Sequence, residues 1–213
     1  MTNTGRILTA VALATMVATS AWAANTPVTA TGTNTVSPTL AVKATLVKAV
    51  QLTLDTGTGC TVSNGGGGDF SLDFGSVDAL GVSTGCTGAG AGKFTTVVGG
   101  VNKAVYYTDY TLTPRFTNQS SSSASTLGAY VSSAFSQSGF SIVQSVSAPS
   151  AFADLTAMST SSGAPTNVAG ASSNIVSSTP LTRYIGVLVD GSSGNAPTGS
   201  SSTAVVTYTL TIQ

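Results

Sequence analysis

The chain of 213 residues contains no histidine and no glutamate, and charged residues make up only 7% of it. An average soluble protein carries about 25% charged residues. Without histidine the chain cannot form a Ser–His pair or complete a zinc site of the usual ligands. The seven acidic side chains are all aspartates, and none is placed as a suggestive acid–base pair. We therefore expect neither enzymatic activity nor a bound cofactor.

Two short motifs resemble catalytic or phosphate-binding sequences. Residues 81–85 (GVSTG) match the G-x-S-x-G pattern, but that pattern requires a strand-to-helix turn and a histidine base. Residues 88–92 (GAGAG) are not followed by Lys-Ser or Lys-Thr in the register of a P-loop, and no βαβ unit surrounds them. The first motif is therefore a chance match, and the second predicts a flexible turn.

Basic residues are few and scattered along the chain. Once Arg6 is removed with the predicted signal peptide, six Lys and Arg face seven Asp, which gives a net charge of −1. Binding to nucleic acid requires clustered Lys and Arg, so no nucleic-acid partner is expected. A surface of Ser, Thr, Gly and Asn with little charge suits packing into an assembly.

A long apolar run is also missing, apart from one short segment near the N-terminus. Arg6 precedes residues 7–18 (ILTAVALATMVA), and residues 21–23 (AWA) fit a cleavage site before Ala24. The run is shorter than the roughly 20 residues that span a bilayer. Residues 1–23 are therefore predicted to be a signal peptide. The mature chain is expected to be secreted and to have no membrane span.

Only two cysteines occur, Cys60 and Cys86. In an exported chain they are expected to form a disulfide, which closes a loop of roughly 26 residues and contributes about 3–3.5 kcal/mol in the chain-entropy model. A metal pair or a redox motif is disfavoured because there is no C-x-x-C and no histidine.

Two groups of side chains leave a binding role open. Three aspartates near the cysteines could hold calcium, although solvated turn carboxylates are the simpler interpretation: Asp69, Asp73 and Asp78. Four tyrosines could form a sugar-binding platform, although packing within a sheet is favoured: Tyr106, Tyr107, Tyr110 and Tyr130.

Period-two alternation of apolar residues recurs along the mature chain. It predicts strands at residues 70–74, 82–86, 93–98, 104–117, 127–135, 140–146, 183–190 and 203–213. The glycines of residues 64–68 predict a loop. Gly- and Ser-rich loops separate them, and residues 151–158 are the one plausible helical turn. Many short strands without an amphipathic helix indicate an all-β sandwich or barrel.

The alternation is longest at residues 35–55. Seven of the eight even-numbered positions from 40 to 54 are apolar, and Lys48 is the exception. Fully extended, these 15 residues would span roughly 50 Å at ~3.3 Å per residue, whereas typical strands have about 5–6 residues. Either two strands follow one another, or the first half pairs outside its own domain. We favour the second interpretation, with the change near Lys48.

The arrangement resembles the spore-coat-U-like pilins, fimbrial subunits assembled by archaic chaperone–usher systems. The resemblance lies in the signal peptide, residues 44–54, residues 60–62 (CTV), residues 72–78 (LDFGSVD), Cys86 and residues 205–212. It covers the N-terminal third and the last strand.

The resemblance implies an immunoglobulin-like β-sandwich that lacks one strand and is completed by a donor strand from another subunit. Residues 24–46 would be a tail with the donor strand, and residues 47–213 a single sandwich domain. The donor side chains would be Val36, Leu40, Val42, Ala44 and Leu46, while Val50, Leu52 and Leu54 would belong to the subunit's own first strand.

The partners implied are copies of the chain in a head-to-tail polymer, a periplasmic chaperone and an outer-membrane usher. The location implied is a bacterial cell-surface fimbria, reached via the periplasm, that supports surface adhesion or biofilm. The alternative function is a secreted carbohydrate- or surface-binding adhesin, suggested by the large loops at residues 118–126 and 159–179.

Overall fold

The computed structural model describes residues 44, 49–66, 69–117, 125–170, 175–192 and 201–212. The chain divides into two units, Met1–Thr45 and Leu46–Gln213, and all described strands lie in the second. The predicted signal peptide lies outside the described residues, as do the predicted donor residues Val36, Leu40, Val42 and Leu46. Ala44 is described, and it is exposed and outside any strand.

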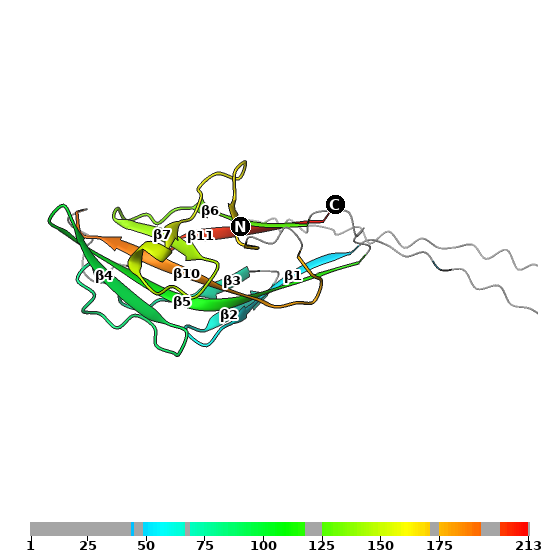
Figure 1. Ribbon diagram of the computed structural model, residues 1–213, viewed down its shortest axis with the longest axis horizontal. Coiled ribbons are helices and arrows are strands. Elements are labelled where there is room, and N and C mark those ends of the chain that lie inside the picture. Colours follow the sequence, from blue (N-terminus) through cyan, green and yellow to red (C-terminus); the bar gives the residue numbers. More distant parts are fainter. Residues whose placement is uncertain are drawn as a thin grey trace, which may run out of the picture. The chain divides into compact units, whose positions relative to one another are not determined.

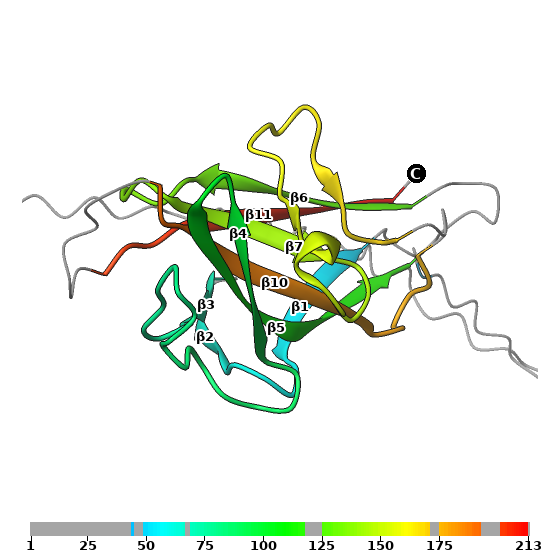
Figure 2. The same cartoon turned by 60° about the vertical axis from the view of Figure 1, so that its left-hand side comes forward.

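One long strand, β5 (Val101–Phe116), organises the larger sheet. Its β-branched and aromatic residues favour an extended chain, and it has partners along both edges. The sheet has the order β1-β5-β10-β7-β8, with β4 also paired to β5 (Figure 2). The other strands of this sheet are β1 (Val50–Thr56), β4 (Gly92–Val98), β7 (Phe140–Ser145), β8 (Thr156–Ala157) and β10 (Leu181–Asp190).

A second sheet has the order β11-β6-β9 and lies over the first (Figure 1). Its strands are β6 (Thr126–Ser133), β9 (Thr166–Asn167) and β11 (Val205–Thr211). A separate hairpin consists of β2 (Val62–Gly66) and β3 (Asp69–Leu72). Every strand pair is antiparallel. The predicted all-β class is therefore confirmed, with two sheets in a sandwich-like arrangement.

The core lies between the two sheets and uses alternate residues of each strand. Its buried members include Tyr106, Tyr110 and Leu112 of β5, Leu127 and Ala129 of β6, and Ile185, Val187 and Val189 of β10. A smaller cluster of Val105, Val143 and Leu155 covers the other face of β5. The central part of β5 is therefore buried on both faces, which explains its unbroken run of apolar and aromatic residues.

Two local predictions differ from the structure, and a third holds for a shorter segment than predicted. Residues 62–66 form β2, although the glycines from Asn64 predicted a loop; the pairing with β3 continues through a register shift there. Residues 82–86 were expected to return as a strand but form a loop. The predicted helical turn is a single 3-10 turn, η1 (Phe152–Asp154), followed directly by β8.

Candidate functional site

The most notable surface feature is a pair of sheet edges, one in each layer. Within the described residues, β1 pairs only with β5, and β11 pairs only with β6. Each of the two strands therefore has an outer edge without a strand partner in that part of the chain. Edge strands present unpaired backbone N–H and C=O groups, which are ready to pair with another extended segment.

Apolar side chains beside these edges are only half-covered. Leu52 and Leu54 of β1 are partly buried and pack against the central core cluster. Val206, Tyr208 and Leu210 of β11 do the same from the other layer. Two open edges thus border one core, and an added strand would find both backbone partners and apolar side chains there.

The two layers are tied together beside these edges by a pair of tyrosines. The hydroxyl of Tyr208 in β11 donates a hydrogen bond of 3.0 Å to the hydroxyl of Tyr110 in β5. Their rings meet edge to face with centroids 6.0 Å apart. Burial raises the pKa of Tyr110 to about 12 and raises that of Tyr208 well above its ordinary value. Both hydroxyls are therefore neutral at physiological pH.

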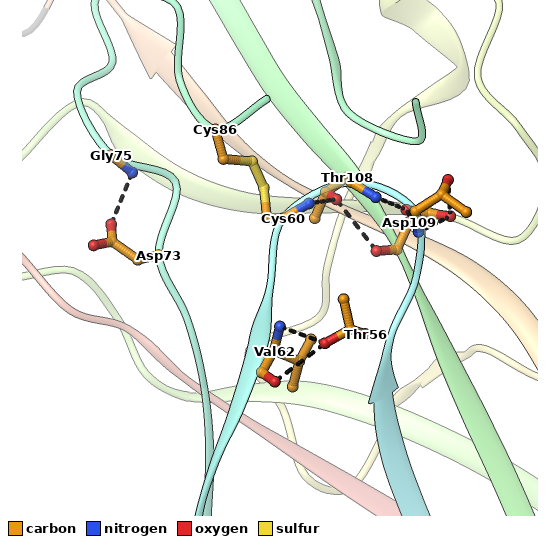
Figure 3. Close-up of a disulfide and its surroundings, with 10 residues drawn as sticks. Thr56, Cys60, Val62, Asp73, Gly75, Cys86, Thr108 and Asp109 are labelled. Carbon is orange, nitrogen blue, oxygen red and sulfur yellow. Dashed lines mark hydrogen bonds between the residues drawn. A yellow bond between two sulfur atoms is a disulfide. The ribbon is translucent and has the colours of Figure 1, made fainter. Parts of the chain in front are cut away.

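One edge of β5 pairs with β4 along its first half and with β1 along its second half. Asp109 of β5 lies between these two pairings (Figure 3). Its carboxylate accepts hydrogen bonds of 2.8 Å from the backbone N–H groups of Thr58 and Gly59. The next residue, Cys60, donates its N–H to the hydroxyl of Thr108 at 2.8 Å. Asp109 therefore fixes the turn that follows β1.

The predicted disulfide between Cys60 and Cys86 is confirmed, with their Cα atoms 5.5 Å apart (Figure 3). It connects the turn after β1 to the loop before β4. Together with the hydrogen bonds to Asp109, it secures one end of the open β1 edge.

The glycines around Asp109 are explained by close packing. A Cβ atom at Gly57 would lie 2.4 Å from the Asp109 carboxyl, and one at Gly90 would lie 2.0 Å from it. The Gly90 carbonyl also accepts the N–H of Asp109. The predicted turn is present: the N–H of Ala91 donates to the carbonyl of Gly88 at 3.1 Å, and the turn packs closely against Asp109. One sequence signal could have found this site: a single aspartate inside a β-branched and aromatic run, in a chain with two glycine-rich turns.

Asp78 organises the loop that contains the G-x-S-x-G motif. Its carboxylate accepts the backbone N–H groups of Leu80, Val82 and Ser83. Burial alone would raise the pKa of Asp78, but these hydrogen bonds outweigh it and lower the pKa well below its ordinary value. The amides are thus engaged by a carboxylate and not by a neighbouring strand, which explains why residues 82–86 form a loop. No helix follows the motif.

Two of the three aspartates considered as calcium ligands accept hydrogen bonds from nearby backbone amides. Asp73 accepts the N–H of Gly75 at 2.7 Å, and Asp78 accepts three amides as described above. The side chain of Asp69 lies outside the described part. Among the residues that the structure describes, no three His, Cys, Asp or Glu side chains are grouped so that they could hold a metal.

The tyrosines considered as a sugar platform pack within the protein. Tyr106 and Tyr110 are each 2% exposed. Tyr107 stacks on Phe94 with ring centroids 5.3 Å apart, and Tyr130 is half-buried on β6. The packing interpretation is therefore confirmed for the first three.

No protein-family model matches the chain, and neither does a curated protein or a solved structure. Within the described residues, no helix is long and apolar enough to span a membrane.

Proposed function

We propose that this protein is a structural subunit of an extracellular filament assembled by donor-strand exchange. The observation that carries the proposal is the pair of open edges, β1 and β11, which border one core with half-covered apolar side chains. The chain also has a long alternating segment immediately before β1. A segment of this kind from a second copy has the chemistry to occupy those edges.

The dimensions support this pairing. Residues 40–46 of the candidate donor are seven residues long, as are β1 and β11. Their even positions carry Leu40, Val42, Ala44 and Leu46, which would all lie on one face of an extended segment. Directed towards the core, that face would cover the half-buried side chains of both edge strands, while the donor backbone pairs antiparallel with the free edge of β11.

On this proposal the domain is an immunoglobulin-like sandwich that is complete only when a donor strand occupies it. Repetition of the same contact from copy to copy is heterologous and does not close, so it generates a fibre. A periplasmic chaperone would protect the same edges before assembly at an outer-membrane usher. The filament would lie on the cell surface and support adhesion or biofilm formation.

Deleting residues 24–46 tests the proposal. The full mature chain is expected to form a ladder of SDS-resistant oligomers that collapses on heating, because strand addition is strong but not covalent. The deletion variant is expected to remain folded, with the Cys60–Cys86 disulfide intact by peptide mapping, and to give no ladder. Normal polymerisation of the deletion variant would show that the proposal is wrong.

A further inference from the structure

Among the described residues, the exposed large aliphatic side chains lie mainly at the two ends of the β-sheet unit, Leu46–Gln213. We call the end where β1 begins and β5 ends the base end; there Val50 pairs with Phe116. The far end is the turn between β4 and β5, where Val98 pairs with Val101. In the part of the chain that the structure describes, eight large hydrophobic side chains are exposed: Val50, Leu80, Val82, Val97, Val98, Val146, Val176 and Val205.

The far-end surface consists of Leu80, Val82 and Val97. Leu80 and Val82 are 62% and 78% exposed, and Val97 is 64% exposed. A Cβ atom at Gly81 would lie 2.3 Å from the Thr95 methyl, so this loop lies directly against β4. Val97 follows Thr95 on the same face of β4, because alternate residues of a strand share a face. The loop and the strand therefore contribute to one patch.

The loop that carries Leu80 and Val82 is rigidly built. Asp78 accepts three of its backbone amides. The ammonium of Lys93 donates to the carbonyls of Gly81 and Ser83 at 2.7 and 2.8 Å. These five backbone groups are thus bonded within the protein, while two aliphatic side chains are presented to solvent. Contiguous exposed apolar side chains mark interaction surfaces.

The base-end surface consists of Val50 and Val176, on either side of Phe116. Val50 is 49% exposed and Val176 is 61% exposed. The backbone N–H of Phe116 donates to the hydroxyl of Ser177 at 2.9 Å, which places Val176 beside this strand end. A shallow hollow of about 240 Å³ lies here, lined by Ala49, Val50, Gln51, Arg115, Phe116, Thr117, Ser177 and Ser178.

The direction of strand addition decides which surfaces meet. β11 begins near the far end, where the N–H of Ser136 donates to the hydroxyl of Ser202 between β6 and β7, and it runs towards the base end (Figure 1). A donor strand that pairs antiparallel with the free edge of β11 would run from the base end to the far end, parallel to β1. Its C-terminal end would leave the acceptor at the far end, and there it leads into the donor's own β1.

The connection between donor strand and β1 is short. If residues up to Leu46 lie in the acceptor, residues 47–49 alone reach β1, which begins at Val50. Three extended residues span at most about 10 Å. We therefore propose that the base-end surface of one copy packs directly against the far-end surface of the next. This inference rests on the proposed donor-strand exchange and names a second contact between the same two copies.

A photo-cross-linking amino acid, p-benzoylphenylalanine, tests the contact in the full mature chain. It replaces Val97 in one variant and Leu80 in a second. Ala157, an exposed residue on β8 away from both ends, carries it in the control. Mixed ¹⁵N-labelled and unlabelled copies are polymerised and irradiated, and cross-linked peptides are sequenced by mass spectrometry. Cross-links between isotopically different copies are expected from positions 97 and 80 to residues 49–51 or 175–178, and not from position 157.

The outcomes separate the two proposals. A polymer whose cross-links from positions 97 and 80 miss the base-end surface overturns this contact and leaves strand exchange standing. A wild-type chain that forms no ladder overturns strand exchange and this contact together. If only the control variant polymerises, the bulky probe has blocked the contact at positions 97 and 80, which supports it.

Discussion

The hydroxyl of Tyr208 donates a hydrogen bond to the hydroxyl of Tyr110 across the two layers, at 3.0 Å. Tyr110 lies opposite Thr56 of β1, so this bond connects the layers beside both open edges. The bond sets the spacing between the two sheets, and an inserted donor strand would have to match that spacing.

Replacing either tyrosine by phenylalanine removes this bond and leaves the partner hydroxyl unpaired. Tyr208→Phe and Tyr110→Phe are each expected to lower the free energy of unfolding by about 1–3 kcal/mol. Urea denaturation of both single variants and of the double variant measures the coupling between them. A coupling energy near zero would contradict a direct interaction.

The close packing at Asp109 makes Gly90 intolerant of a side chain. Gly90→Ala would place a methyl group 2.0 Å from the carboxylate oxygen, so a loss of several kcal/mol in unfolding free energy is expected. Gly163→Ala is the matched control, because its nearest contact, the Ser161 hydroxyl at 3.8 Å, is ordinary. Thermal unfolding of the two variants provides the measurement, and equal melting temperatures would refute the packing argument.

The disulfide is expected to contribute about 3 kcal/mol, because it closes a loop across a sequence separation of 26 residues. The double substitution Cys60→Ala with Cys86→Ala should lower the midpoint of chemical denaturation accordingly. The Asp109 hydrogen bonds remain, so the variant is expected to fold. A variant as stable as the wild type would show that Asp109 alone fixes this turn.

Stability should stay level across the neutral range and fall at both extremes. The ion pair with Lys103, at 2.7 Å, lowers the pKa of Asp190 to about 2, and hydrogen bonds also lower that of Asp78. Their contribution is present above about pH 4 and lost as the pH falls further. Burial raises the pKa of Tyr110 to about 12, so its contribution is lost as the pH rises from 10 towards 12.

Melting temperatures between pH 2 and pH 11 test this profile. With no histidine and no glutamate in the chain, a transition near pH 6–7 would contradict it.

The strands of the fold could be predicted largely from the sequence. Alternation located β4, β7, β10 and β11 to within a few residues, and the β-branched and aromatic run located β5, whose central part is buried on both faces. It also suggested a change near Lys48, and β1 begins at Val50. The Cys60–Cys86 disulfide followed from the presence of just two cysteines in a chain predicted to be exported.

Sheet order and edges could not be predicted in this way. Alternation reports a buried face and does not say which strands lie beside one another, so the free edges of β1 and β11 required the structure. The role of Asp109 was missed because its partners, Thr58 and Gly59, lie about 50 residues away in sequence. The far-end surface was missed for the same reason, since the loop with Leu80 and the strand with Val97 are brought together by contacts such as that of Gly81 with Thr95.

Polymerisation of two full-length variants tests the central claim most directly. Val42→Asp places a charge on the proposed donor face, and Thr45→Asp places the same charge on the opposite face of the same segment. A buried unpaired carboxylate is costly, so Val42→Asp is expected to abolish the heat-labile ladder, whereas Thr45→Asp should retain it. Equal polymerisation of both variants would contradict insertion of this segment into a neighbouring copy.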